Sequence, residues 1–372
     1  MRLLALALED FRNLAAVDLC PGPRVTIAVG SNGQGKTNLL EAVYFLATLK
    51  PLRAGRLAEL VRFGADRARV SGRFELKGAE RQISVEVSQG AKAAFVDGKR
   101  AATLEDYFGG VSVVAFTPDD LATVKGGPDD RRRLVDRAVF NRFPAFLEES
   151  RAYARALKNR NRLLRDRTGG AVQEAFDATL CRAAARVWTR RLALLAELAP
   201  RTAKAFEAIG RTAAPAELNY RAAHLSLDLA RASEAERAAA LAEALAARLP
   251  RDVERGFTSV GPHADDLEVR LGSRLARAYA SQGQQRALVL AWKVAEIENL
   301  RAALGYLPLL LLDDVSSELD PERNAYLMAY LADSGAQVFL STTDASLVKR
   351  AAGPDTRWLT VQAGVVSSLA GP

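Results

Sequence analysis

The residues best suited to chemistry lie in one glycine-rich segment, GSNGQGKT, which runs from Gly30 to Thr37 directly behind the apolar run Val25–Val29. The spacing matches G-x-x-x-x-G-K-[ST], the pattern of a phosphate-binding loop. Glycines let the backbone bend so that successive N–H groups point at phosphate oxygens. Lys36 is expected to reach the β and γ phosphates, and Thr37 to offer its hydroxyl to Mg2+. An ordinary glycine-rich turn before a helix would not explain this Lys–Thr pair. The expected nucleotide-binding residues are Gly30, Ser31, Asn32, Gly33, Gln34, Gly35, Lys36 and Thr37.

Two carboxylates, Asp313 and Asp314, follow a second apolar run, Leu309–Leu312. A carboxylate at the carboxyl end of a buried strand is where an α/β ATPase holds Mg2+, so Asp313 is expected to bind the metal. Asp314 is placed to orient or deprotonate the attacking water, although its side chain is shorter than the usual Glu. Asp314 and Lys36 are therefore the expected catalytic residues.

A third segment, SQGQQ, begins a stretch of good helix propensity and places Ser281 and Gly283 at its positive end. This is a second candidate anion site. One chain seldom needs two helix ends for one γ phosphate, which suggests that this segment completes the nucleotide site of a second subunit across a two-fold axis.

These segments must be positioned by sheets. Residues 2–8 are expected to form an edge strand, followed by a turn at DFRN, and residues 67–96 alternate with period two, which predicts an antiparallel sheet with a tight turn at Asp97–Gly98. Another strand is expected at Val111–Phe116. Residues 128 to about 250 are rich in Ala, Leu and Arg and predict helices. The sequence therefore predicts an α/β fold: an ATPase head with a mixed sheet and an antiparallel β subdomain (residues 1–125 and 255–372), interrupted by an all-helical arm (126–254).

Basic side chains follow helical spacing within the predicted arm. Seven basic residues and one acid, Asp166, lie between Arg151 and Arg167, so pairing within the helix cannot neutralise them. A phosphate backbone could, and so could salt bridges elsewhere in the chain or simple solvation. The DNA-binding candidates on this stripe are Arg151, Arg155, Lys158, Arg162 and Arg165. A second cluster, Arg131–Arg133, has the same alternatives.

The excess of basic residues favours a polyanionic partner, either nucleic acid or an acidic membrane surface, and charge alone does not choose between them. The net charge is +8, and 49% of the residues are hydrophobic, which is typical of a globular protein. Cys20 and Cys181 are far apart and are expected to stay as free thiols in a reducing cytoplasm. No run approaches the length of a membrane span and the N-terminus does not resemble a secretory signal, so nothing in this sequence is expected to span a bilayer. DNA, and not a membrane, is the expected partner. His263 lies in a turn, where a structural role is commoner than catalysis.

The order of the motifs resembles that in the heads of ABC-type ATPases, which include transporters, structural-maintenance-of-chromosomes (SMC) proteins and Rad50. The motifs are the phosphate loop, SxGQ before a helix, the strand with DD, and SELD. Longer phrases resemble the RecF family of bacterial recombination mediators over nearly the whole chain, most weakly in the helical region. These phrases are FRN, GSNGQGKTNLLEA, VAFTPDDL with VKGGPDDRRR, GPHADDL, ASQGQQR and LLLLDDVSSELD.

The resemblance implies a weak, DNA-stimulated ATPase that dimerises around two ATP molecules and binds DNA at single-strand gaps. It further implies a role in loading recombinase with RecR and RecO, in replication restart and in the SOS response. ATP and Mg2+ are the implied cofactors. By likeness, Arg12 and Asn13 touch the nucleotide, although turn chemistry is the alternative for both. Ser281, Gly283 and Gln284 would act in trans, and Asp320 would lie at the dimer seam.

Two departures from transporter heads are visible. Thr343 stands where transporters carry a switch His, and no Gln follows the strand Val111–Phe116, so whether Asp119 or Asp120 contacts the metal is open. Hydrolysis is accordingly expected to be slow. The alternative functions are an SMC- or Rad50-like chromosome-organising head that uses ATP only to dimerise, and a transporter ATPase subunit. The second alternative would require the missing His and Gln.

Overall fold

The computed structural model describes residues 1–372 except 54, 211, 213, 223 and 370–372. The chain divides into two compact units. One comprises residues 1–121 and 293–372, and the other residues 122–292. The first unit thus joins the two ends of the chain, and the second holds the predicted helical segment together with SQGQQ.

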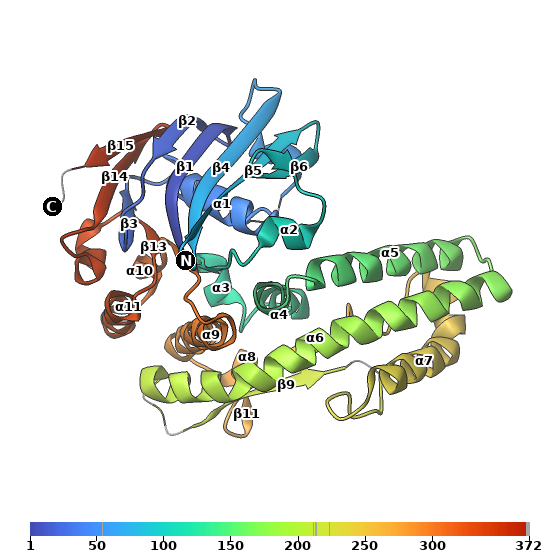
Figure 1. The fold of residues 1–372 in the computed structure, drawn as a ribbon. Helices are drawn as coiled ribbons and strands as arrows, with labels where there is room; N and C mark the ends of the chain where they lie inside the picture. Colours follow the sequence, from blue (N-terminus) through green and yellow to red (C-terminus); the bar gives the residue numbers. More distant parts are fainter. Residues whose placement is uncertain (54, 211, 213, 223, 370–372) are drawn as a thin grey trace. The chain divides into compact units, whose positions relative to one another are not determined.

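One sheet of the first unit contains the strands that precede the phosphate loop and the two carboxylates; β3, β13, β14 and β15 of this sheet are labelled in Figure 1. Its strand order is β15-β14-β3-β13-β12-β8, with bounds Val365–Leu369, Arg357–Gln362, Val25–Val29, Val338–Thr342, Leu309–Asp313 and Val113–Phe116. All of these strands are parallel to their neighbours except β15, which pairs antiparallel with β14. Because parallel strands end at the same edge, β3 delivers the loop beside the carboxylates of β12. The predicted strands at residues 25–29 and 309–312 are confirmed.

The second sheet of this unit is antiparallel, as the period-two pattern of residues 67–96 predicts. Its order is β2-β1-β4-β5-β6-β7, with bounds Leu14–Leu19, Arg2–Phe11, Arg67–Leu76, Ala79–Ser88, Ala91–Val96 and Lys99–Arg100. The expected tight turn at Asp97–Gly98 connects β6 to β7. The expectation of an edge strand at residues 2–8 is wrong, because β1 pairs with both β2 and β4. The loose alternation of β1 reflects burial between neighbours, and β2 takes the edge.

Helix α1 (Lys36–Thr48) follows the phosphate loop and contacts β12 and β13 of one sheet and β1 and β4 of the other. Its sequence, NLLEAVYFLA, has almost no polar face, which is typical of a helix buried on all sides. The loop is therefore anchored to a rigid element held between two sheets. The other short helices of the unit are η1 (Leu57–Leu60), α2 (Leu104–Phe108), α10 (Val315–Glu318), α11 (Pro321–Ser334) and η2 (Ala345–Ala351). Helices α3 (Pro118–Ala122) and α9 (Gln282–Leu304) cross the division between the units.

The second unit is dominated by helices α4 (Pro128–Arg142), α5 (Phe146–Arg165), α6 (Ala171–Gly210) and α7 (Glu234–Arg255). The predicted helical segment is confirmed in these elements. On α5, Phe146, Tyr153 and Leu164 are buried, whereas Leu157 is only half-buried. The apolar stripe therefore faces α6 and α7, which both contact α5.

The same segment also contains one strand, which an all-helical arm does not include. β9 (Ala216–Arg221) pairs antiparallel with β10 (Asp266–Leu271), and β10 pairs with β11 (Arg274–Leu275). Pro215 precedes β9 and disfavours a helix there, but six residues carry too little periodicity to show a strand. The short helix α8 (Ala276–Tyr279) follows β11.

Among the described residues, none of the helices combines the length and the apolar character that a membrane crossing needs. Cys20 is exposed and Cys181 is buried, and both thiols are free, as expected.

Candidate nucleotide-binding site

The phosphate loop connects the end of β3 to the start of α1, as predicted. Lys36 is buried, and its ammonium donates hydrogen bonds to the carbonyl oxygens of Gly30 at 2.7 Å and Ser31 at 2.8 Å. Burial lowers the pKa of Lys36, while the carboxylates of Asp314 and Asp313 oppose that shift. The loop and its cation thus form one hydrogen-bonded unit that faces the two carboxylates.

The carboxylate of Asp313 lies beside the loop. The hydroxyl of Thr37 donates to Asp313 Oδ1 at 2.8 Å, and the hydroxyl of Ser341 donates to the same oxygen at 2.7 Å. Ser341 lies on β13 in register with Asp313, which explains the contact. Ser341 is not predictable from the sequence, because the pairing of β12 with β13 is a long-range feature that no local pattern encodes.

Asp314 occupies a constrained position immediately after β12. Its φ is +49°, in the left-handed region that is uncommon for a non-glycine residue, and its N–H donates to Ser341 Oγ at 3.0 Å. Burial raises the pKa of Asp314, and the nearby charge of Lys36 opposes this. Its Oδ1 is buried and finds no hydrogen-bond partner among the described residues. A buried carboxylate oxygen that accepts no hydrogen bond from the chain is suited to accept one from a water molecule during a reaction.

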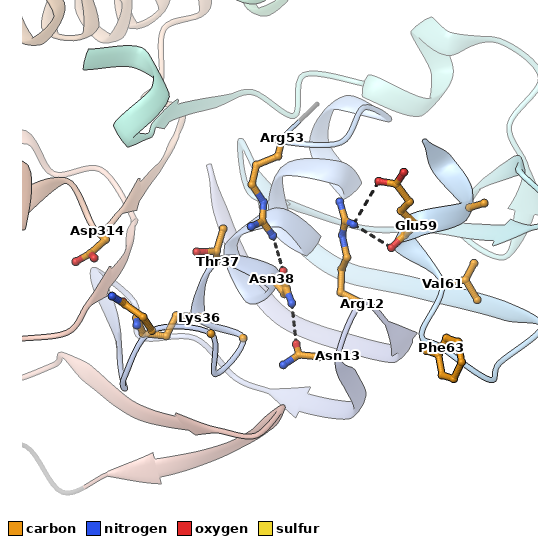
Figure 2. A pocket seen from close by; sticks show the side chains of 14 residues that line it. Arg12, Asn13, Lys36, Thr37, Asn38, Arg53, Glu59, Val61, Phe63 and Asp314 are labelled. Atoms are coloured by element: carbon orange, nitrogen blue, oxygen red, sulfur yellow. Dashed lines mark hydrogen bonds and ion pairs between the residues drawn. The ribbon is translucent and has the colours of Figure 1, made fainter. Parts of the chain in front are cut away.

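Lys36, Thr37 and Asp314 line one pocket of about 720 Å³, within the range of about 300–1,000 Å³ typical of small-molecule sites. Figure 2 shows Lys36 and Asp314 at one end, with Val61 and Phe63 away from them. The predicted residues that the pocket includes are Arg12, Asn13, Asn32, Gly33, Gly35, Lys36, Thr37 and Asp314. The lining residues that sequence analysis missed are Asn38, Arg53, Ala58, Glu59, Val61 and Phe63. Residues 53–63 follow neither a helical nor a strand period, so the sequence holds no signal for them.

Arg12 and Asn13 form the turn between β1 and β2 and also line the pocket, and their contact with a nucleotide stays a prediction. The guanidinium of Arg12 makes a two-fold contact with the fully buried carboxylate of Glu41, with Nε–Oε2 at 2.9 Å and Nη2–Oε1 at 3.2 Å. Asn13 Oδ1 accepts a hydrogen bond from Asn38 at 2.8 Å (Figure 2). Both side chains are therefore held in fixed positions at the pocket wall.

The oxygen donors of this site suit a hard divalent cation. Thr37 and Asp313 already lie within hydrogen-bond distance of each other, and Mg2+ commonly takes one or two protein ligands together with phosphate oxygens and water. No group of three or more His, Cys, Asp or Glu suited to a metal occurs in the part of the chain that the structure describes. A metal shared with a bound triphosphate fits this donor set better than a closed protein site.

Ser281 and Gln284 form a reciprocal cap at the start of α9, in the second unit. Ser281 N–H donates to Gln284 Oε1 at 2.9 Å, and Gln284 N–H donates to Ser281 Oγ at 3.2 Å. Ser281 is exposed and Gly283 is half-buried, so the positive end of α9 is accessible. In the first unit, Asp320 caps α11 by accepting from Arg323 N–H at 3.1 Å.

The two candidates for the role of the missing Gln differ in their surroundings. Asp120 is buried, accepts from Thr117 N–H at 3.0 Å, and pairs with Lys293 Nζ at 3.3 Å. Asp119 is solvent-exposed. Asp120 is thus used within the fold, and of the two carboxylates only that of Asp119 is exposed to solvent.

The two basic clusters differ. The five candidate DNA-binding side chains on α5 are all exposed. Arg162 lies 3.5 Å from Asp166, whereas no ion pair joins Arg151, Arg155 or Lys158 to another residue of the described ranges. Arg131, by contrast, is buried and paired with Asp266 at 2.7 Å, and Arg132 and Arg133 pair with Asp129 and Asp130. Positive charge is thus available on α5 and largely neutralised on α4.

His263 has a structural position. Its Nδ1 lies 2.6 Å from the hydroxyl of Tyr153, and its Nε2 lies 2.9 Å from the carbonyl oxygen of Thr258. Burial lowers the pKa of His263. Nδ1 therefore joins the segment before β10 to α5, and Nε2 holds that segment to itself.

Comparisons with known proteins cover nearly the whole chain. Residues 2–365 match a family model described as RecF/RecN/SMC N terminal domain. The DNA replication and repair protein RecF of Myxococcus xanthus (strain DK1622) is 71% identical over 369 residues, covering 99% of this chain and 97% of the relative. The protein of the same name from Anaeromyxobacter dehalogenans (strain 2CP-1) is 60% identical over 374 residues, covering 99% of this chain and all of the relative.

Solved structures agree with this result. A structure of the recombination mediator protein RecF with ATP, in the RecFOR pathway, superposes with a TM-score of 0.87 at 30% identity and covers 99% of this chain and 97% of that one. An Smc head bound to the C-winged helix domain of ScpA superposes with a TM-score of 0.56 at 18% identity, covering 100% of this chain and 98% of that one. The second match shows a shared fold alone.

Proposed function

Since the chain belongs to the RecF/RecN/SMC family and matches RecF proteins along its whole length, we propose that it is an ATP-gated DNA clamp of recombinational repair. The fold is that of an ABC-type ATPase head, and the relatives are named for DNA replication and repair. In this proposal ATP binding closes a homodimer, closure assembles a DNA-binding surface, and slow hydrolysis reopens it.

The observation that carries the proposal is that Lys36, Thr37 and Asp314 line one pocket, while Asp313 accepts a hydrogen bond from Thr37. The loop N–H groups and Lys36 would bind the β and γ phosphates. Thr37 and Asp313 would hold Mg2+, which when bound neutralises phosphate charge. These roles of the individual residues follow from their chemistry and their likeness to the family.

Asp314 would orient and deprotonate the water that attacks the γ phosphate. Its buried Oδ1 accepts no hydrogen bond from the described residues and could accept one from water. Its raised pKa suits a group that takes up a proton. A shorter carboxylate than Glu and the absence of a switch His at Thr343 favour slow turnover. ATPase activity that is weak and stimulated by DNA is part of this proposal.

The exposed start of α9 would complete the nucleotide site of the partner subunit. Ser281, Gly283 and Gln284 offer hydroxyl, N–H and amide donors at the positive end of a helix of 23 residues. Asp320, at the start of α11, would lie at the dimer seam. The division of the chain into a head (1–125 and 255–372) and an arm (126–254) stays a prediction.

DNA at single-strand gaps is the proposed polymer partner, with RecR and RecO as protein partners in recombinase loading, and roles in replication restart and SOS induction follow from the family. We place the protein in the cytoplasm without a membrane partner. A head that uses ATP only to dimerise, without hydrolysis, is the second candidate. The buried acceptor on Asp314 favours the hydrolysing clamp.

Replacing Arg155, Lys158 and Arg162 together by Ala tests where DNA is bound. The logarithm of DNA affinity falls with the logarithm of salt concentration, and each lost phosphate contact makes this slope less steep by about 0.7–0.9. We therefore expect a slope less steep by about two units and weaker binding at low salt. The measurement is DNA affinity with and without ATP across a salt series.

A triple substitution of Arg67, Arg69 and Arg73 by Ala removes the same charge from β4 and serves as the control. We expect the control to keep the slope of the unmodified protein. Equal slopes for both triple variants would show that DNA does not contact these residues of α5.

A further inference from the structure

The last hairpin of the chain touches the phosphate loop. The turn between β14 and β15 consists of Ala363 and Gly364, with φ values of +48° and +81°. Ala363 N–H donates to the side-chain Oε1 of Gln34 at 2.7 Å, and Gly364 N–H donates to the main-chain oxygen of Gln34 at 2.9 Å. This hairpin turn thus binds one loop residue through both its side chain and its backbone.

The contact is too close for a larger residue. A Cβ placed on Gly364 would lie 2.2 Å from the main-chain oxygen of Asn13, and a Cβ on Gly30 would lie 2.4 Å from the main-chain oxygen of Val361. The phosphate loop is therefore packed against residues 361–364 at its first residue as well as at Gln34. The arrangement follows from the sheet, because β14 pairs parallel with β3 and brings the turn to the edge where the loop begins (Figure 1).

The bonds at Gln34 have a consequence for phosphate binding. Its main-chain oxygen accepts from Gly364 N–H and also from Asn13 Nδ2, at 3.1 Å. In a trans peptide unit the C=O of one residue and the N–H of the next point in opposite directions. Two donors that hold the Gln34 oxygen therefore also fix the direction of the Gly35 N–H, and Gly35 lines the pocket.

We propose that the hairpin turn is a positioning element of the nucleotide site, and that Gln34 is a positioning residue whose side chain serves the hairpin and not the phosphates. This inference rests on the proposed function, since it assumes that the loop binds a nucleoside triphosphate. Fixing a loop in its bound conformation before the ligand arrives raises affinity. Coupling is reciprocal, so nucleotide binding must also stabilise the hairpin turn.

Two variants, each made alone, test the contact. Gly364→Ala introduces the close approach to Asn13, and Gln34→Met removes the acceptor for Ala363 without backbone strain. Gly78→Ala is the matched control, because Gly78 has the same φ of +81° at a hairpin turn, but a Cβ placed on it would meet no described atom within 4 Å. The measurement is the affinity for ATPγS, obtained by titration. We expect both test variants to bind ATPγS at least about fivefold more weakly than the unmodified protein, and the control to bind it equally well.

Amide hydrogen exchange distinguishes a turn that positions the nucleotide site from a turn that only supports the fold, because only the first should change its exchange rate when nucleotide binds. In the unmodified protein, ATPγS is expected to slow exchange of the amides of Ala363 and Gly364 and to leave the Lys77–Gly78 turn unchanged. If Gly364→Ala and Gln34→Met lower the melting temperature as Gly78→Ala does but keep nucleotide affinity and the exchange response, this inference is overturned alone. If the unmodified protein fails to bind ATPγS, the proposed function is overturned with it.

Discussion

Asp314→Asn is expected to abolish ATP turnover while leaving ATP bound. Asn keeps the size of the side chain and tolerates the left-handed backbone of this position, but it cannot take a proton from the attacking water. Loss of a general base lowers rates by about 10²–10⁴-fold, so single-turnover hydrolysis should fall by at least about 100-fold. If hydrolysis reopens the dimer as proposed, the variant should also stay dimeric and on DNA for longer after ATP is diluted.

Asp333→Asn is the matched control, since Asp333 is an exposed carboxylate on α11 in the same unit. It should hydrolyse ATP like the unmodified protein. Unchanged turnover in Asp314→Asn would show that another group activates the water. Absence of turnover in the unmodified protein itself would show a dimerising head without hydrolysis. Loss of ATP binding would show that Asp314 supports the pocket and not the reaction.

Lys36→Met is expected to remove nucleotide binding and everything that depends on it. Met is similar in length and apolar, so it suits the buried position of Lys36 without a cavity. The lost ammonium would no longer donate charge-assisted bonds to two phosphates, and one such bond contributes about 1.5–3 kcal/mol. Loss of about 3 kcal/mol corresponds to roughly 100-fold weaker binding, measured by titration with ATPγS.

The variant should also fail to form an ATP-dependent dimer, and its DNA affinity should no longer change when ATP is added. Lys349→Met, at an exposed position in the same unit, should behave like the unmodified protein. Retention of ATP-dependent dimerisation by Lys36→Met would contradict the assignment of the phosphate loop.

The parts of the site that sequence predicts are those whose chemistry is local. Two such parts have a recognisable spacing: a glycine-rich loop between a strand and a helix, and a carboxylate pair after a buried strand. In the structure they meet, because Thr37 Oγ1 of the loop lies 2.8 Å from Asp313 Oδ1. The parts that sequence misses depend on long-range pairing. Ser341 is next to Asp313 only because β13 lies beside β12, and Gln34 meets Gly364 only because β14 lies beside β3.

Charge shows the same division. Arg131 and Arg155 both belong to basic runs that sequence treats alike, yet Arg131 is buried against Asp266, which lies 135 residues away. Helical spacing correctly predicts one exposed basic face on α5, because that spacing is a local property. The strand β9 is not predictable in this way, since it pairs with β10, which is distant in sequence.

The central claim is that two copies of the chain face each other, each supplying the start of α9 to the other's nucleotide. Sedimentation of the unmodified protein at saturating ATP and Mg2+ tests this claim most directly, with Ser281→Arg as the disrupting variant. We predict a dimer with ATP and a monomer without it, and a monomer under both conditions for Ser281→Arg. A protein that stays monomeric at saturating ATP and Mg2+, or a Ser281→Arg variant that still dimerises and turns over ATP, would contradict the account.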